Sequence, residues 1–230
     1  MRPYSILIIT LAVALALTGC GEKVLTPPEV LQQPTTDPSD YLYSGTVGTE
    51  YVYTQTYVFS DDNGRDSAYT RTYSNTIVSR TADSISGVKR VQTRSNVLIP
   101  QSERTFSADV NRMWGSDTTF TELASPLSIG SVYYRVFFGR STIQSMDDTL
   151  RTPAGSFRCI KIVSDSTTFS MTDSTGTVLY ADIKAIATVW YSPGTHAVMQ
   201  KEEGRITRST YPTPWKRVSI TTTLVKINRK

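Results

Sequence analysis

The feature that most constrains the fold of this chain is a strict alternation of side-chain types over residues 51–59. The aromatic residues there fall on alternate positions, which are Tyr51, Tyr53, Tyr57 and Phe59, and smaller residues occupy most of the positions between them. A period of two is typical of a β-strand with two different faces, because successive side chains point to opposite sides. Asn63-Gly64 follows and predicts a type I′ turn into a partner strand over residues 69–78.

The same pattern continues to the end of the chain. With 34 Thr and 13 Tyr, the composition favours strands over helices, and turn signals recur at residues 86–87, 173–176 and 192–194. No convincing amphipathic helix is found. We therefore expect one all-β domain over residues 45–230, an antiparallel meander of eight to eleven strands with little or no helix. It would curl into a half-barrel or fold as a β-sandwich.

Charge and residue counts exclude several function classes. The chain carries 24 basic and 20 acidic residues, for a net charge of +4, and no block of like charge that would bind nucleic acid. One His and two Cys cannot build the usual metal centres. The sequence thus predicts no metal, no cofactor, no nucleic-acid partner and no enzymatic activity.

The first twenty residues have the pattern of an export signal. Met1-Arg2 is a short basic start, residues 6–17 form an apolar run interrupted only by Thr10, and Leu17-Thr18-Gly19-Cys20 follows directly. The run is too short to span a bilayer, so residues 1–19 are predicted to be a signal peptide. The last four residues resemble the lipobox of bacterial lipoproteins, which implies cleavage between Gly19 and Cys20 and acylation of Cys20.

Acyl chains on Cys20 would attach the protein to a membrane, since two or more chains hold stably where one does not. Residues 20–44 contain Pro27, Pro28, Pro34 and Pro38 among polar residues, which predicts an extended tether. Gly21 stands where an Asp would, by resemblance to the enterobacterial sorting rule, retain a lipoprotein in the inner membrane. We therefore expect an envelope protein of the outer membrane.

Two turn motifs carry a family resemblance. Residues 153–162 read Pro-Ala-Gly-Ser-Phe-Arg-Cys-Ile-Lys-Ile, and residues 190–194 read Trp-Tyr-Ser-Pro-Gly. This order resembles a group of uncharacterised bacterial envelope proteins, many of them lipoproteins, and the resemblance implies an envelope β domain with no assigned reaction. His196 stands where that group has Gly, so the loop after Pro193 is expected to bend differently.

The aromatic residues give the main indication of function. If the sheet curls without closing, its concave side can hold an apolar ligand or acyl chain. The predicted ligand face consists of Tyr51, Tyr53, Tyr57, Phe59 and Trp190. Alternatives are an envelope protein partner, an assembly subunit that pairs through a sheet edge, and a carbohydrate hydrolase for which no carboxylate pair stands out.

The residues that could form a catalytic or metal site have simpler structural explanations. A Cys159, His196 and Asp182 constellation is conceivable, but Cys159 is more simply a buried apolar side chain. The acidic stretch at residues 61–66 does not have the spacing of an EF-hand loop and is expected to be a solvated hairpin tip.

The lipobox generates the first prediction. Cys20→Ser should release the protein from the membrane fraction or leave the precursor unprocessed, because the thioether to the lipid can no longer form. Fractionation and the intact mass of the native protein measure this. Unchanged processing and membrane residence of the variant would contradict acylation at Cys20.

Overall fold

The computed structural model describes residues 32–230, except 83, 93–97, 109–111, 115–120, 136–138, 173–177 and 210–212. The predicted signal peptide, Cys20 and most of the predicted tether lie outside these residues. The described part is built almost entirely of strands, together with one short 3-10 helix, η1 (Pro38–Tyr41).

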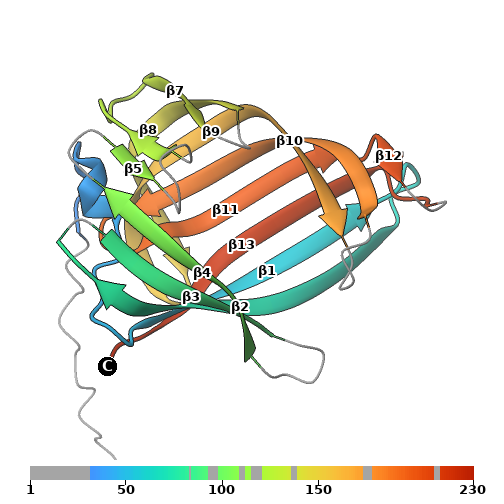
Figure 1. Ribbon diagram of the computed structural model, residues 1–230. Coiled ribbons are helices and arrows are strands. Elements are labelled where there is room, and N and C mark those ends of the chain that lie inside the picture. Colours follow the sequence, from blue (N-terminus) through green and yellow to red (C-terminus); the bar gives the residue numbers. More distant parts are fainter. Residues whose placement is uncertain are drawn as a thin grey trace, which may run out of the picture. The chain divides into compact units, whose positions relative to one another are not determined.

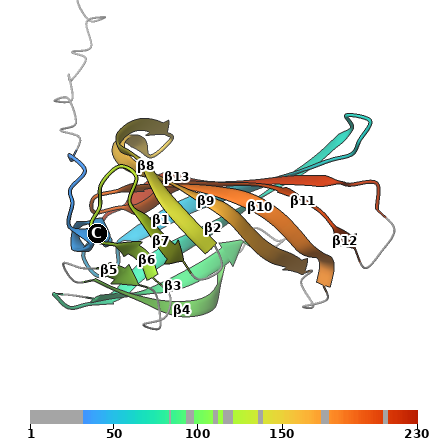
Figure 2. The same ribbon diagram turned by 90° about the horizontal axis from the view of Figure 1, so that it is seen from above.

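Thirteen strands form one antiparallel sheet, which curls around a concave side (Figures 1 and 2). Their order across the sheet is β6-β5-β4-β3-β2-β1-β13-β11-β10-β9-β8-β7, and β12 pairs with β10 beside this path. The strands are β1 (Glu50–Ser60), β2 (Asp66–Arg80), β3 (Ser84–Gln92), β4 (Leu98–Ala108), β5 (Arg112–Trp114), β6 (Thr121–Ala124), β7 (Val132–Arg135), β8 (Gly139–Thr152), β9 (Gly155–Thr172), β10 (Val178–Ser192), β11 (His196–Arg205), β12 (Arg208–Ser209) and β13 (Arg217–Asn228).

The all-β half-barrel is confirmed, with more strands than the eight to eleven expected. Its two edge strands, β6 and β7, contact each other, which brings the sheet close to a barrel. In the described residues no backbone ladder joins these two strands, and side chains hold the seam instead: the Tyr133 hydroxyl donates to the Glu122 carbonyl oxygen at 3.2 Å.

Strand β1 shows why the alternation is strict. It lies between β2 and β13, and its four alternating aromatic side chains are all buried. Two of them stack on cross-strand neighbours, Tyr53 on Tyr73 with centroids 5.0 Å apart and Tyr57 on Tyr69 at 4.5 Å. Such cross-strand aromatic pairs stabilise a sheet and fix its register.

The β1–β2 hairpin differs from the predicted two-residue turn. Ser60 pairs with Asp66, so the loop has five residues, and Gly64 adopts a positive φ of 78°. The Asp61 side chain organises this loop, because its carboxylate accepts hydrogen bonds from the backbone of Asn63 at 2.8 Å and of Arg65 at 2.9 Å. Those bonds lower the pKa of Asp61, and its carboxylate also pairs with the Arg65 guanidinium.

The folded unit begins before residue 45. Tyr41, Leu42 and Tyr43 were predicted to be part of the tether, but all three are buried in the main apolar cluster. Segment η1 contacts β4 and β5, and the segment after it is tied to the β10–β11 turn, where Ser44 N donates to the Gly194 carbonyl oxygen at 2.7 Å. Apolar side chains among the prolines therefore close one end of the curled sheet.

Removal of one of these side chains tests this assignment. Tyr41 is fully buried, and its hydroxyl is bonded to the backbone of Thr35. Tyr41→Ala should lower the free energy of unfolding by about 3–5 kcal/mol, the usual cost of deleting a large buried aromatic ring. Tyr134→Ala, at a residue 75% exposed, is the control and should change it by less than about 0.5 kcal/mol. Equal effects in denaturant titrations would show that Tyr41 is not part of the core.

Candidate functional site

A cavity of about 260 Å³ lies on the concave side of the sheet. Side chains from eight strands and from the segment after η1 surround it. Its principal lining residues are Tyr43, Tyr53, Gln55, Arg71, Tyr73, Phe106, Glu122, Arg135, Tyr191, His196, Gln200 and Thr222. The lining therefore combines aromatic rings with amide, hydroxyl and charged groups.

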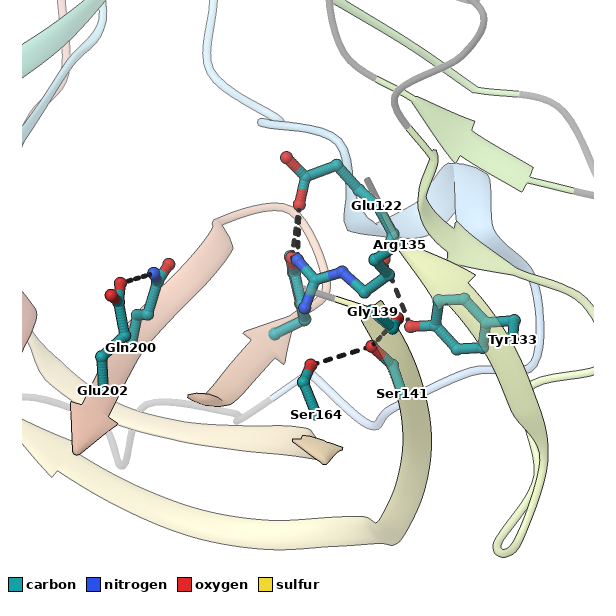
Figure 3. Close-up of polar contacts among 9 residues, drawn as sticks. Glu122, Tyr133, Arg135, Gly139, Ser141, Ser164, Gln200 and Glu202 are labelled. Carbon is teal, nitrogen blue, oxygen red and sulfur yellow. Dashed lines mark hydrogen bonds and ion pairs between the residues drawn. The ribbon is translucent and has the colours of Figure 1, made fainter. Parts of the chain in front are cut away.

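A buried ion pair forms one wall of the cavity (Figure 3). Arg135 on β7 donates from Nη2 to Glu122 Oε2 on β6 at 3.0 Å and to the Tyr191 hydroxyl at 2.7 Å. That hydroxyl in turn donates to Glu122 Oε2 at 2.5 Å. The three side chains thus connect the two edge strands to β10 in the middle of the sheet.

The environment fixes the charges of this triad. Burial alone would raise the pKa of Glu122, but the Arg135 guanidinium and the hydrogen bonds it receives hold that pKa below its usual value. Burial raises the pKa of the Tyr191 hydroxyl well above its usual value. Glu122 is therefore an anion, Arg135 a cation and Tyr191 a neutral donor. A carboxylate tied in this way is not available as a general acid or nucleophile.

His196 lies beside the triad in an aromatic cage. Its ring stacks on Tyr43 with centroids 5.0 Å apart and contacts Phe106 at 4.8 Å and Tyr191 at 5.4 Å. The backbone of His196 has a φ of 59°, which is uncommon outside glycine. The resemblance led us to expect a different bend here, yet the histidine itself adopts the left-handed conformation that a glycine would favour.

A row of polar side chains crosses the concave face next to the aromatic cage. Four adjacent strands contribute one residue each at the same level, and these are Arg71, Gln55, Thr222 and Gln200. Gln55 Oε1 accepts from Arg71 Nε at 2.8 Å and from the Tyr57 hydroxyl at 2.8 Å. On β11, Gln200 donates to the carboxylate of Glu202 at 2.5 Å, and burial raises the pKa of that carboxyl (Figure 3).

This polar row divides the interior. The main apolar cluster, with Tyr51 and Tyr53, lies on one side, and a smaller cluster with Tyr57 and Phe59 lies on the other. The predicted ligand face is thus split between two clusters. Only Tyr53 of its five residues lines the cavity. The indole of Trp190 donates to Asp148 at 3.1 Å and lies 5.7 Å from Lys161 Nζ.

The environment of Cys159 does not support a catalytic constellation of Cys159, His196 and Asp182. Cys159 is fully buried, and burial raises its pKa to about 12, the reverse of what a reactive thiolate needs. The side chain of Asp182 lies outside the described residues. Within the described ranges no group of three or more His, Cys, Asp or Glu side chains is placed to hold a metal ion.

A wider groove of about 1000 Å³ lies near the β1–β2 hairpin and is lined by charges of both signs, among them Asp62, Asp165, Lys184 and Arg217. It is open to solvent and has no buried charged pair on its wall. The described ranges contain no helix with the length and hydropathy of a membrane-spanning segment.

Comparisons with known proteins identify no family. No family model and no curated protein matches the chain. Several solved structures show distant likeness. Among them, a candidate lipoprotein from Parabacteroides distasonis has 14% identity and a TM-score of 0.47, and the match covers 85% of this chain and 100% of that one. A candidate exported protein with a YmcC-like fold from Bacteroides fragilis has 11% identity and a TM-score of 0.48, covering 82% and 99%. A candidate outer-membrane lipoprotein-sorting domain from Vibrio parahaemolyticus has 10% identity and a TM-score of 0.23, covering 80% and 86%. Similarity this distant carries no information on ligand or activity.

The triad generates a prediction about stability. Glu122→Gln should cost about 3–5 kcal/mol near neutral pH, because it leaves the buried guanidinium of Arg135 without its counter-ion. Since the pKa of Glu122 is lowered in the folded state, the carboxylate stabilises the fold above the unfolded-state pKa of about 4.3. This contribution is lost as the pH falls through the lower folded-state pKa. The difference in free energy of unfolding between wild type and Glu122→Gln should therefore become smaller at that pH.

An exposed ion pair provides the matched control. Arg140 and Asp165 are 3.5 Å apart and both 56% exposed, so Asp165→Asn should cost no more than about 1 kcal/mol at any pH. Denaturant titrations from acid to neutral pH compare the two variants. Similar small losses for both would show that the Glu122–Arg135 pair does not hold the seam.

Proposed function

We propose that this chain is a lipid-anchored lipoprotein of the bacterial envelope, directed to the outer membrane, that binds a small amphipathic ligand inside its half-barrel and has no enzymatic activity. The lipobox and the absence of Asp at position 21 support the anchor and its location. The ligand proposal depends on one observation, the cavity of about 260 Å³ between the aromatic cluster and the polar row.

The composition of the lining supports an amphipathic ligand over a purely apolar one. The rings of Tyr53, Tyr73 and Phe106 offer apolar contact, while Gln55 and Arg71 lie at the same cavity. Arg71 is exposed and its guanidinium carbon lies 5.1 Å from the Tyr57 ring centre, so a cation stands at the solvent side of the site. Among the charged lining residues, Glu122 and Arg135 neutralise each other. The positive charge of Arg71 remains, and it suits an anionic head group.

The alternatives receive less support. Strands β6 and β7 have four residues each and contact one another, which leaves these two edges little backbone for pairing with a partner. A hydrolase would need two available carboxylates facing a cleft. On the concave side Glu122 is committed to Arg135 and Tyr191.

Filling the cavity tests this proposal. Thr222 lines it from β13, whereas the side chain of Thr221 points to the opposite face of the same strand. Thr222→Phe should weaken binding of the anionic apolar dye 8-anilinonaphthalene-1-sulfonate at least about tenfold, because the added ring takes the ligand's place. Thr221→Phe is the control and should leave the affinity unchanged.

Native mass spectrometry of the protein from its own envelope complements the dye titration. A co-purified small amphiphile, lost in Thr222→Phe, supports the proposal. A wild-type protein that carries no small molecule and takes up no dye would refute the ligand, and equal dye affinity in both variants would place binding outside the cavity.

A further inference from the structure

An exposed apolar patch lies on the seam side of the sheet, at the turn between β6 and β7 and on β7 itself. It consists of Ile129, Val132 and Tyr134, which are 70%, 44% and 75% exposed. Among the described residues, no other six consecutive positions hold more than one exposed large hydrophobic side chain. We refer to these three residues as the seam patch.

The turn at the centre of this patch is bonded through its backbone to Ile143 of β8 and is open to solvent at Gly130. Ser131 N donates to the Ser128 carbonyl oxygen at 3.0 Å and closes the turn. Gly130 has a positive φ of 83°, and a side chain added there would meet no atom within 4 Å. Turn tips of this kind are usually polar, so an isoleucine at the tip is not explained by the turn geometry.

The register of β7 fixes the direction of its apolar side chains. Tyr133 and Arg135 make the hydrogen bonds that hold the seam, so they point to the interior. Alternation along the strand then directs Val132 and Tyr134 outward. These two side chains therefore form an apolar outer surface, which the described part of the chain leaves exposed.

The seam patch lies at the same end of the curled sheet as the first described residues. Segment η1 contacts β5, β5 pairs with β6, and β6 contacts β7, and both views show η1 and β7 at one end (Figures 1 and 2). Between Cys20 and Gln32 the chain has eleven residues, 21–31, which span at most about 40 Å when extended. If Cys20 is acylated, Gln32 therefore lies within about 40 Å of the membrane surface.

We infer that the seam patch contacts the surface of the membrane that holds the lipid anchor. Tyr134 suits the interface between head groups and acyl chains, and Ile129 and Val132 suit the apolar side of that interface. The inference rests on the acylation of Cys20 in the proposed function. The inference goes beyond the proposed function, because it assigns a second membrane contact that would orient the half-barrel.

The size of the patch favours a membrane over a second protein. A stable protein interface buries roughly 800 Å² on each partner and involves about 20–30 residues a side. Three side chains fall far short of this. A tethered surface is held at a high effective concentration, so a contact too weak to act alone is occupied once the anchor is inserted.

Site-directed fluorescence tests the contact in the full lipidated protein. Ile129→Cys carries an environment-sensitive nitrobenzoxadiazole label in vesicles of phosphatidylethanolamine and phosphatidylglycerol. Cys20 would be acylated and Cys159 is fully buried, so the introduced thiol is the one that reacts. Ile186→Cys on β10, at a residue 53% exposed, is the matched control.

The expected result is a label at position 129 that nitroxide lipids quench at least about twofold more than the label at 186, and that aqueous iodide quenches less. Iodide access equal to that at position 186 would overturn the inference. Protection from both quenchers would also overturn it, since a protein would then cover the patch.

The intact mass of the purified protein separates this inference from the proposed function. A mass without acyl chains refutes the anchor. It also removes the tether on which the membrane contact depends, so the contact is refuted together with the anchor. A mass with acyl chains, combined with iodide access at position 129 equal to that at 186, refutes the contact and leaves the anchor intact.

Discussion

The contact between Arg135, Glu122 and Tyr191 closes the sheet, and the shape of the interior depends on it. A curled antiparallel sheet ends in two edge strands, and a closed barrel removes them by backbone pairing. Here β6 and β7 meet through side chains, with a buried guanidinium at the centre. Taking such charges out of water is costly, so the pair holds only because each charge has a partner.

The interior also depends on what closes its end and what crosses its middle. Tyr41, Leu42 and Tyr43 are buried in the main apolar cluster, where the Tyr43 hydroxyl lies 3.2 Å from that of Tyr53. The polar row with Gln55 and Gln200 then separates the apolar interior into two clusters. A cavity therefore remains where these polar side chains meet the aromatic rings.

Much of the fold could be predicted from the sequence because strand alternation is local. The burial of Tyr51 and Phe59 follows from period two, and the turns at residues 153–154 and 193–195 follow from Pro and Gly. Ser86-Gly87 was expected to form a turn, but Gly87 lies inside β3 opposite Ile77, next to an irregularity in the ladder. Glycine inside a strand often marks such a bulge, and sequence alone does not distinguish it from a turn.

The candidate site could not be predicted in the same way. Glu122 and Arg135 belong to four-residue strands too short to show a period, and a charged residue in a strand is ordinarily exposed. Their pairing joins opposite edges of the sheet, which is a consequence of the curl. The burial of Tyr41 to Tyr43 was not predicted, because nearby prolines indicate an extended segment. In the structure these residues after Pro38 are buried in the core.

A seam held by side chains also affects how readily this part of the sheet opens. Parting β6 from β7 breaks few hydrogen bonds and leaves the eleven other strands paired as before. Local opening of this kind has a much smaller activation barrier than unfolding and occurs on its own, faster timescale. Backbone amide protons of β6 and β7 can therefore exchange with solvent at the rate of this local opening, and their exchange is decoupled from the lifetime of the fold.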